Sequence, residues 1–153
     1  MPDNPPEGIQ TVTVRIAYED PIRAVAFLEQ AFGFPEIVEK RLEGANGAII
    51  VTEVQVGDSY IMIGPAGSHD IASPASLGSS TESLMVYVDK IEAHFARAKS
   101  NGAQIVTEPS DQYWGDRRYE AKDHEGHLWF FHEHTRDVPR EEIEEIEAGF
   151  RQA

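Results

Sequence analysis

Residues 115–129, which read GDRRYEAKDHEGHLW, decide the fold of this 153-residue chain. Segments 118–122 and 127–132 are predicted strands, and Gly126 marks the turn between them. Gly126 also belongs to a set of residues that recur 69 positions apart. The matching pairs are Tyr18/Tyr87, Asp20/Asp89, Ile22/Ile91, Ala24/Ala93, Gly33/Gly102, Glu39/Glu108 and Gly57/Gly126. Because helix starts, helix ends and turns repeat together with the apolar runs, the chain is predicted to contain a duplicated module.

The first module is expected at residues 10–64. Alternating apolar residues predict a half-buried strand at 11–18, with Val12, Val14 and Ile16 on one face. Asp20 is a predicted helix cap with Pro21 at the first helical position, and Gly33 is the predicted helix end. Three more strands are expected at 36–42, 48–56 and 59–63, separated by glycine turns.

The second module is expected at residues 83–135, after a linker at 65–82 that is rich in Gly, Ser, Ala and Pro. It repeats the order of the first: strand 83–88, helix 90–101, and strands 103–107, 118–122 and 127–132. Residues 1–9 are expected to form a mobile arm. Residues 136–153 are expected to form an acidic helix whose apolar stripe, Ile143, Ile146 and Phe150, must lie on this chain or on a partner.

The composition excludes several classes of function. Thirteen Lys and Arg against 27 Asp and Glu give a net charge of −14, which disfavours nucleic acid and anionic membranes as partners. The absence of cysteine excludes disulfides, thiolate metal sites and a cysteine nucleophile. No segment has the length of a membrane span or the pattern of a secretion signal, so a cytoplasmic protein is expected.

The two β-α-β-β-β modules, together with the 115–129 hairpin and the segment Ala31, Phe32, Gly33 and Phe34, resemble the vicinal oxygen chelate superfamily. This superfamily contains glyoxalase I, extradiol dioxygenases and fosfomycin- and bleomycin-resistance proteins, and the match is to the bleomycin-resistance-like branch. The resemblance implies an α+β fold in which two tandem modules form a curved mixed-sheet cavity, followed here by the C-terminal helix. It also implies a homodimer.

Enzymes of this superfamily hold a divalent metal with residues at four strand positions. In this chain the resemblance assigns those positions to Thr13, Ile61, Phe130 and either Glu82 or Ser83, since the register of strand 83–88 is open. At most one of these is a carboxylate, so no metal site and no cofactor are predicted. His124, His127, His132 and His134 lie close together in the sequence, but turn and surface histidines are favoured over a zinc site.

Period-two alternation assigns the expected cavity wall. The resemblance places the Thr13 side chain toward the cavity. Because side chains alternate between the two faces of a strand, every second residue of each strand is then also expected to face the cavity. Trp114, with Tyr113, is a candidate lid, although this pair can equally be a plug at a subunit boundary. Arg117 and Arg118 can hold an anionic group, but ion pairs with neighbouring carboxylates are favoured. The predicted ligand-binding residues are Thr13, Arg15, Ile61, Ile63, Met85, Tyr87, Trp114, Leu128, Phe130 and His132.

These predicted cavity residues are compatible with three functions. The favoured one is a metal-free small-molecule binding protein that sequesters an aromatic or cationic compound, with no catalytic residue. The second is a metal-dependent lyase or oxidoreductase of the glyoxalase or dioxygenase type. The third is a metal-free catalyst in which His132 is the general base. The sequence does not identify the ligand, and it contains no serine-nucleophile, phosphate-loop or dinucleotide motif.

Overall fold

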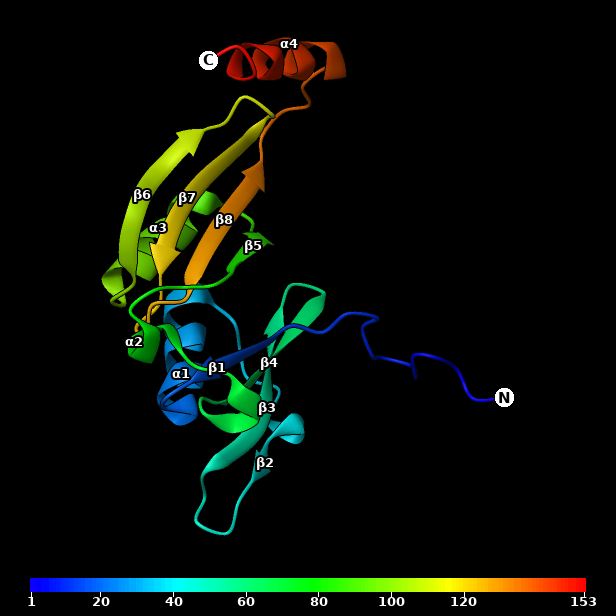
Figure 1. Cartoon of the computed structure of the whole chain (residues 1–153), viewed down its shortest axis with the longest axis vertical. Coiled ribbons are helices and arrows are strands. Elements are labelled where there is room, and N and C mark those ends of the chain that lie inside the picture. Colours follow the sequence, from blue (N-terminus) through cyan, green and yellow to red (C-terminus); the bar gives the residue numbers. More distant parts are fainter.

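The computed structural model describes residues 1–153 and contains two modules of four strands each, as the duplicated sequence predicts (Figure 1). The elements of the first module and the linker are β1 (Arg15–Tyr18), α1 (Pro21–Phe27), η1 (Leu28–Phe32), η2 (Val38–Lys40), β2 (Leu42–Glu43), β3 (Ile49–Val56), β4 (Ser59–Pro65), η3 (Ser68–Asp70) and α2 (Pro74–Leu77). Those of the second module and the C-terminus are β5 (Ser83–Tyr87), α3 (Ile91–Ser100), β6 (Gln104–Asp111), β7 (Asp116–Lys122), β8 (Leu128–His134) and α4 (Arg140–Phe150).

The two sheets have the same topology, with strand orders β1-β4-β3-β2 and β5-β8-β7-β6. In each sheet the first strand pairs in parallel with the last, and the remaining pairs are antiparallel. The α+β class with two tandem modules is therefore confirmed. The edge strands β1 and β5 have one hydrogen-bonded neighbour each.

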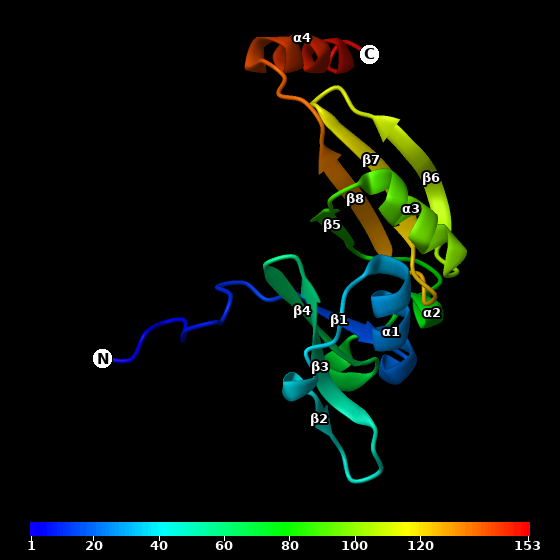
Figure 2. The same ribbon diagram turned by 180° about the vertical axis from the view of Figure 1, so that it is seen from behind.

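One continuous core joins the two modules. α3 covers one face of the second sheet and leaves the other face open, as the opposite views in Figures 1 and 2 show. η1 of the first module packs against α3. Phe32 and Phe34, at the end of η1, contact Trp129 and Phe131 of β8, with ring centroids 4.8–6.2 Å apart. The helix sides of the two modules are thus buried against each other.

The first helix begins and ends as its sequence predicts. The Asp20 side chain accepts a hydrogen bond from the Arg23 N–H at 3.0 Å, and Pro21 occupies the first turn. α1 continues into the π-helical η1, which ends at Gly33 in the left-handed conformation. In the second module the helix cap is Lys90, also left-handed, and not Asp89. The connection from β5 to α3 therefore has one residue more than the connection from β1 to α1.

Two predicted strands of the first module are wrong in extent. Pairing in β1 begins at Arg15, and the side chain of Gln10 instead bonds the backbone of Tyr60 on β4. The predicted strand 36–42 contains only a single bridge at Glu36, then η2, and at its end Leu42, the first residue of β2. The reason is local: the Glu36 carboxylate accepts hydrogen bonds from Arg41 at 2.6 and 2.8 Å and from Thr52 at 2.7 Å, which folds the segment back on itself.

The C-terminal helix begins at Arg140 and lies beyond the end of the second sheet (Figure 1). Its attachment is narrow. The Tyr113 hydroxyl donates to the Glu147 carboxylate at 3.2 Å, and the rings of Tyr113 and Phe150 are 5.7 Å apart. Phe150 is otherwise exposed. None of the helices has the length and apolar character that crossing a membrane requires.

Candidate functional site

Cross-strand pairs define the two faces of each sheet, because directly opposite residues point to the same side. In the first sheet Ile16 pairs with Ile63, and Arg15 pairs with Met62. Ile63 is fully buried and Ile61 is 7% exposed, and both belong to the core on the helix side. The predicted inward orientation of Ile61 and Ile63 is therefore wrong. Tyr60 and Met62 occupy the open face of β4.

The physical reason lies in the connections. The β3–β4 hairpin has the two-residue loop Gly57-Asp58, whereas β7 and β8 are joined by five residues, 123–127. The pair that closes the first hairpin, Val56 and Ser59, lies on the helix side, and the pair that closes the second, Lys122 and Leu128, lies on the open face. A constant offset of 69 residues thus aligns the turns of the two modules, but it matches residues on the helix side of the first sheet with residues on the open face of the second.

The open face of the first sheet carries an unpartnered guanidinium. Arg15 lies flat on Gly64, where a Cβ would stand 2.5 Å from Arg15 Nη2, so glycine is needed for this approach. The Arg15 Nε is buried and has no hydrogen-bond partner. Thr13 lies on the same face, with its hydroxyl 3.4 Å from that of Tyr60. Arg15 and Thr13 are therefore neighbours, as the alternation of β1 predicts.

The open face of the second sheet carries five of the predicted residues together. Met85 pairs with Phe130, Tyr87 with His132 and Ser83 with Leu128, so their side chains share one side. Met85 and Tyr87, on the edge strand, are 62% and 57% exposed. The β8 residues on the helix side are Trp129 and Phe131, both fully buried. The register left open in the sequence is thus settled: Ser83, and not Glu82, begins the paired strand.

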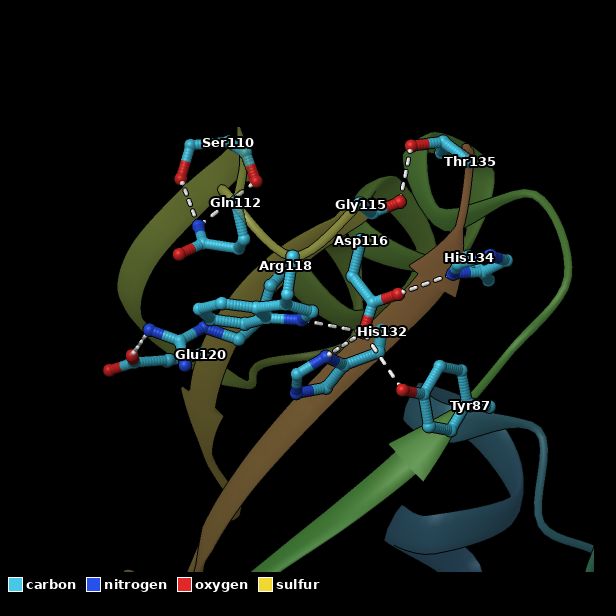
Figure 3. A network of polar contacts seen from close by, with 11 residues as sticks. Tyr87, Ser110, Gln112, Gly115, Asp116, Arg118, Glu120, His132, His134 and Thr135 are labelled. Atoms are coloured by element: carbon cyan, nitrogen blue, oxygen red, sulfur yellow. Dashed lines mark hydrogen bonds and ion pairs between the residues drawn. The ribbon is translucent and has the colours of Figure 1, made fainter. Parts of the chain in front are cut away.

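Asp116 is the centre of a polar network at the end of this face (Figure 3). Its carboxylate is 2% exposed. Oδ2 lies 2.8 Å from the Tyr87 hydroxyl, 2.8 Å from Trp114 Nε1 and 3.0 Å from His132 Nδ1, while Oδ1 lies 2.9 Å from His134 Nδ1. Burial raises the pKa of this carboxyl, but the four hydrogen bonds outweigh burial and lower it to about 2. Asp116 is therefore ionised at neutral pH.

His132 is held by this network at one nitrogen only. Nδ1 faces the carboxylate, whereas Nε2 is buried and has no hydrogen-bond partner. The rings of Trp114 and His132 are 6.3 Å apart. The cross-strand partner of His132 is Arg118, whose guanidinium lies 5.5 Å from the Trp114 ring and 5.3 Å from the Phe130 ring. Arg118 also pairs with Glu120 at 2.9 Å, and Arg117 pairs with Glu92 and Asp111.

A groove of about 810 Å³ lies between the two modules. Its walls come from the segment before β1, the β3–β4 turn and the free edge of β5. Met85 and Tyr87 line it, together with Val12, Val14 and Tyr60. Ile61 packs in the core on the helix side but also borders this groove. The predicted site is thus divided in the single chain: Met85 and Tyr87 lie between the groove and the Asp116 network, Arg15 lies on the other sheet, and Ile63 lies in the core.

The residues present do not form a metal centre. No three His, Asp or Glu side chains are arranged to hold a metal ion. Of the positions assigned to metal ligands, Ile61 belongs to the hydrophobic core and Phe130 lies against the Arg118 guanidinium, and neither side chain has an atom that can bind a metal ion. His124 and His127 were predicted at the turn or the surface, but His127 is buried and only 7% of the His124 side chain is exposed. His127 Nε2 contacts the Ala17 carbonyl at 2.7 Å, and His124 stacks on Tyr18. They join the modules and face no cavity.

Tyr87, Trp114 and His132 of this network are among the ligand-binding residues predicted from the sequence, whereas Asp116 and His134 are not. In the sequence Asp116 suggests an ordinary ion pair with the neighbouring arginines, and His134 suggests a surface histidine. Trp114 is half-buried, covering the sheet, while its neighbour Tyr113 contacts α4. A signal was present: Asp116 starts β7 opposite His134 and two positions before Arg118, the partner of His132, so pairing the two strands brings these groups together.

Comparisons with known proteins agree with this fold. The model of the Glyoxalase/Bleomycin resistance protein/Dioxygenase superfamily matches residues 9–131. The crystal structure of TioX from Micromonospora sp. ML1 is similar, with 32% identity, a TM-score of 0.65, and coverage of 85% of this chain and 100% of that chain. An uncharacterized protein of Mycobacterium tuberculosis is 29% identical over 134 residues, covering 84% of this chain and 77% of its own length.

A third similar structure is the fosfomycin resistance protein FosX from Listeria monocytogenes. It has a TM-score of 0.60 and 16% identity, and the alignment covers 88% of this chain and 97% of that chain. At this identity the likeness concerns the fold alone.

Proposed function

Because the chain belongs to the glyoxalase/bleomycin resistance protein/dioxygenase superfamily, we propose that it binds a small, flat organic compound, aromatic or cationic, and needs no metal ion for binding. The proposed binding surface is the open face of the second sheet. Its residues are Met85, Tyr87, Trp114, Leu128, Phe130 and His132, with Arg118. The proposed role is sequestration of the compound.

The observation that carries this proposal is the exposure of apolar and aromatic groups beside a polar network. Met85 and Tyr87 are more than half exposed beside the groove, and apolar surfaces with a few convergent polar groups are the usual form of ligand sites. The planar guanidinium of Arg118 lies over the rings of Trp114 and Phe130, which shows that a flat group fits between these side chains.

A homodimer is part of the proposal. The free edge of β5 and the apolar groove beside it expose Val12, Val14, Met85 and Tyr87. Unpaired edges and apolar grooves of this kind are commonly covered by another chain. A partner would also close the open faces, which the single chain leaves uncovered. Light scattering that gives a dimer mass would support this assembly, and a monomer at micromolar concentration would contradict it.

The ligand is sought with a thermal-shift screen of antibiotics and aromatic metabolites, because a ligand that binds only the native state stabilises it by RT ln(1 + [L]/Kd). Each compound is tested with chelator and with added Ni²⁺ or Co²⁺. Phe130→Ala removes the central ring of the surface and is expected to abolish the shift. Val106→Ala, at an exposed position on β6, is the matched control. A shift that requires metal, or that survives in Phe130→Ala, would contradict the proposal.

A further inference from the structure

We propose that His132, oriented by Asp116, accepts a proton from a weakly acidic aromatic ligand, and that Arg118 holds the anion that forms. The inference rests on the proposed binding function and narrows it, because it selects phenols and similar ring O–H or N–H acids among aromatic and cationic compounds. It also gives a chemical role to the Nε2 atom of His132, which has no function if the ligand binds by stacking alone.

The hydrogen bonds fix the tautomer of His132. An ionised carboxylate only accepts hydrogen bonds, so the Nδ1 that faces Asp116 at 3.0 Å must carry the proton. In the neutral imidazole Nε2 then carries the lone pair. This Nε2 is buried and has no partner, although buried polar atoms in native proteins are almost always paired. An unsatisfied acceptor at a candidate binding surface favours a ligand that donates a hydrogen bond.

The surroundings of His132 fit both products of a proton transfer. Asp116 faces Nδ1 and stabilises an imidazolium, as the carboxylate does in catalytic His–Asp pairs. Arg118 is the cross-strand partner of His132 and provides the cation for an anionic ligand oxygen. The remaining titratable groups are Tyr87 and His134, which donate to Asp116, and Glu120, which pairs with Arg118.

Trp114 is the group that a ligand must displace. Its indole N–H makes one hydrogen bond to Asp116 at 2.8 Å, and its ring covers the sheet beside His132. Three other donors still satisfy the carboxylate when this bond is broken. A ligand ring that replaces the indole would stack near Phe130 and place its acidic group at Nε2. The position of the Trp114 ring therefore favours aromatic acids over other acids as ligands.

The proposed step is a simple proton transfer. The ligand O–H bond breaks, the proton forms a bond to Nε2, and the electron pair stays on the ligand oxygen. The products are an imidazolium paired with the Asp116 carboxylate and a phenolate paired with the Arg118 guanidinium. No oxidant, reductant or further reactant is required.

The test uses 4-nitrophenol, whose absorbance reports its ionisation, titrated into the full chain at a pH below the pKa of the free probe. Wild-type protein is expected to lower the apparent pKa of the bound probe by about one unit, a tenfold rise in the ratio of ionised to neutral probe. His132→Gln keeps a polar side chain but loses the base, so it is expected to bind without the shift. His69→Gln is the matched control, since it removes an exposed histidine outside the Asp116 network and should retain the shift.

A second measurement does not depend on the probe. Imidazole ¹⁵N NMR of the unliganded protein is expected to show the Nδ1–H tautomer of His132, and Asp116→Asn is expected to lose that preference. Binding of 4-nitrophenol without ionisation would overturn the inference and leave the proposed function standing. A shift retained in His132→Gln, an Nε2–H tautomer, or no saturable binding of the probe would also overturn it. The ligand screen decides the binding function separately.

Discussion

Asp123 provides the sharpest test of how the two modules are joined. It lies in the loop between β7 and β8 and is 4% exposed. Its Oδ2 accepts from the Tyr18 hydroxyl of β1 at 2.6 Å and from Trp129 Nε1 at 3.1 Å. Its Oδ1 accepts from the backbone N–H groups of Glu125 and His127, both at 3.0 Å. One carboxylate thus holds the second hairpin loop and both modules together.

Asp123→Ala removes all four acceptor contacts at once. The hydroxyl of Tyr18 and the indole N–H of Trp129 belong to fully buried side chains and would be left without partners. Each unsatisfied buried donor costs about 1–3 kcal/mol, so the two together are expected to lower the free energy of unfolding by about 2–6 kcal/mol. This is a large part of a typical domain stability of about 5–15 kcal/mol.

The assay is urea unfolding at pH 7, followed by circular dichroism and by tryptophan fluorescence. Asp123→Asn keeps one oxygen but presents an N–H₂ group to other donors, so an intermediate loss of about 1–3 kcal/mol is expected. Tyr18→Phe removes a donor without leaving one unsatisfied and is expected to cost about 1 kcal/mol. A loss below 1 kcal/mol in Asp123→Ala would refute the reasoning, as would equal losses in the Ala and Asn variants.

Three other outcomes are expected. Ile63→Ala should cost about 2–5 kcal/mol because it empties core space, whereas Met62→Ala on the open face should cost much less; equal losses in urea unfolding would contradict the assigned faces. Burial lowers the pKa of His94, so unfolding stability should fall as pH drops below about 6.5, where the unfolded chain takes up a proton that the folded chain resists; His94→Gln should flatten this slope. Truncation after Val138 removes α4, whose contacts with the second module involve Tyr113, and should leave the circular dichroism of the sheets and the unfolding midpoint nearly unchanged; a lowered midpoint would contradict this.

The elements were predictable where local chemistry determines them. Asp20, Pro21 and Gly33 specify the start and end of the first helical segment through contacts within a few residues. The two faces of β8 were also predictable, because the buried Trp129 and Phe131 alternate with Phe130 and His132. The register of β5 stayed open in the sequence, because its residues are apolar on both faces. The strand 36–42 failed because Glu36 bonds Arg41 and Thr52, and propensity does not reveal such side-chain contacts.

The candidate site was predictable only in part. Ile61 and Ile63 were assigned from a fixed offset, which does not register a hairpin loop of different length or the additional cap residue Lys90. The burial of His124 and His127 depends on Tyr18 and Ala17 of the other module, more than 100 positions away. Contacts at such separation leave no local pattern in the sequence.

The additional residue at Lys90 also bears on how a doubled gene acquires new properties. A single codon inserted where a strand meets its helix can exchange the two sides of that strand, since side chains alternate with a period of two. Residues selected earlier for packing then meet solvent and ligand, and the former ligand residues enter the interior. In this way a change in the length of one connection can give the two halves of a duplicated protein different chemistry without any substitution.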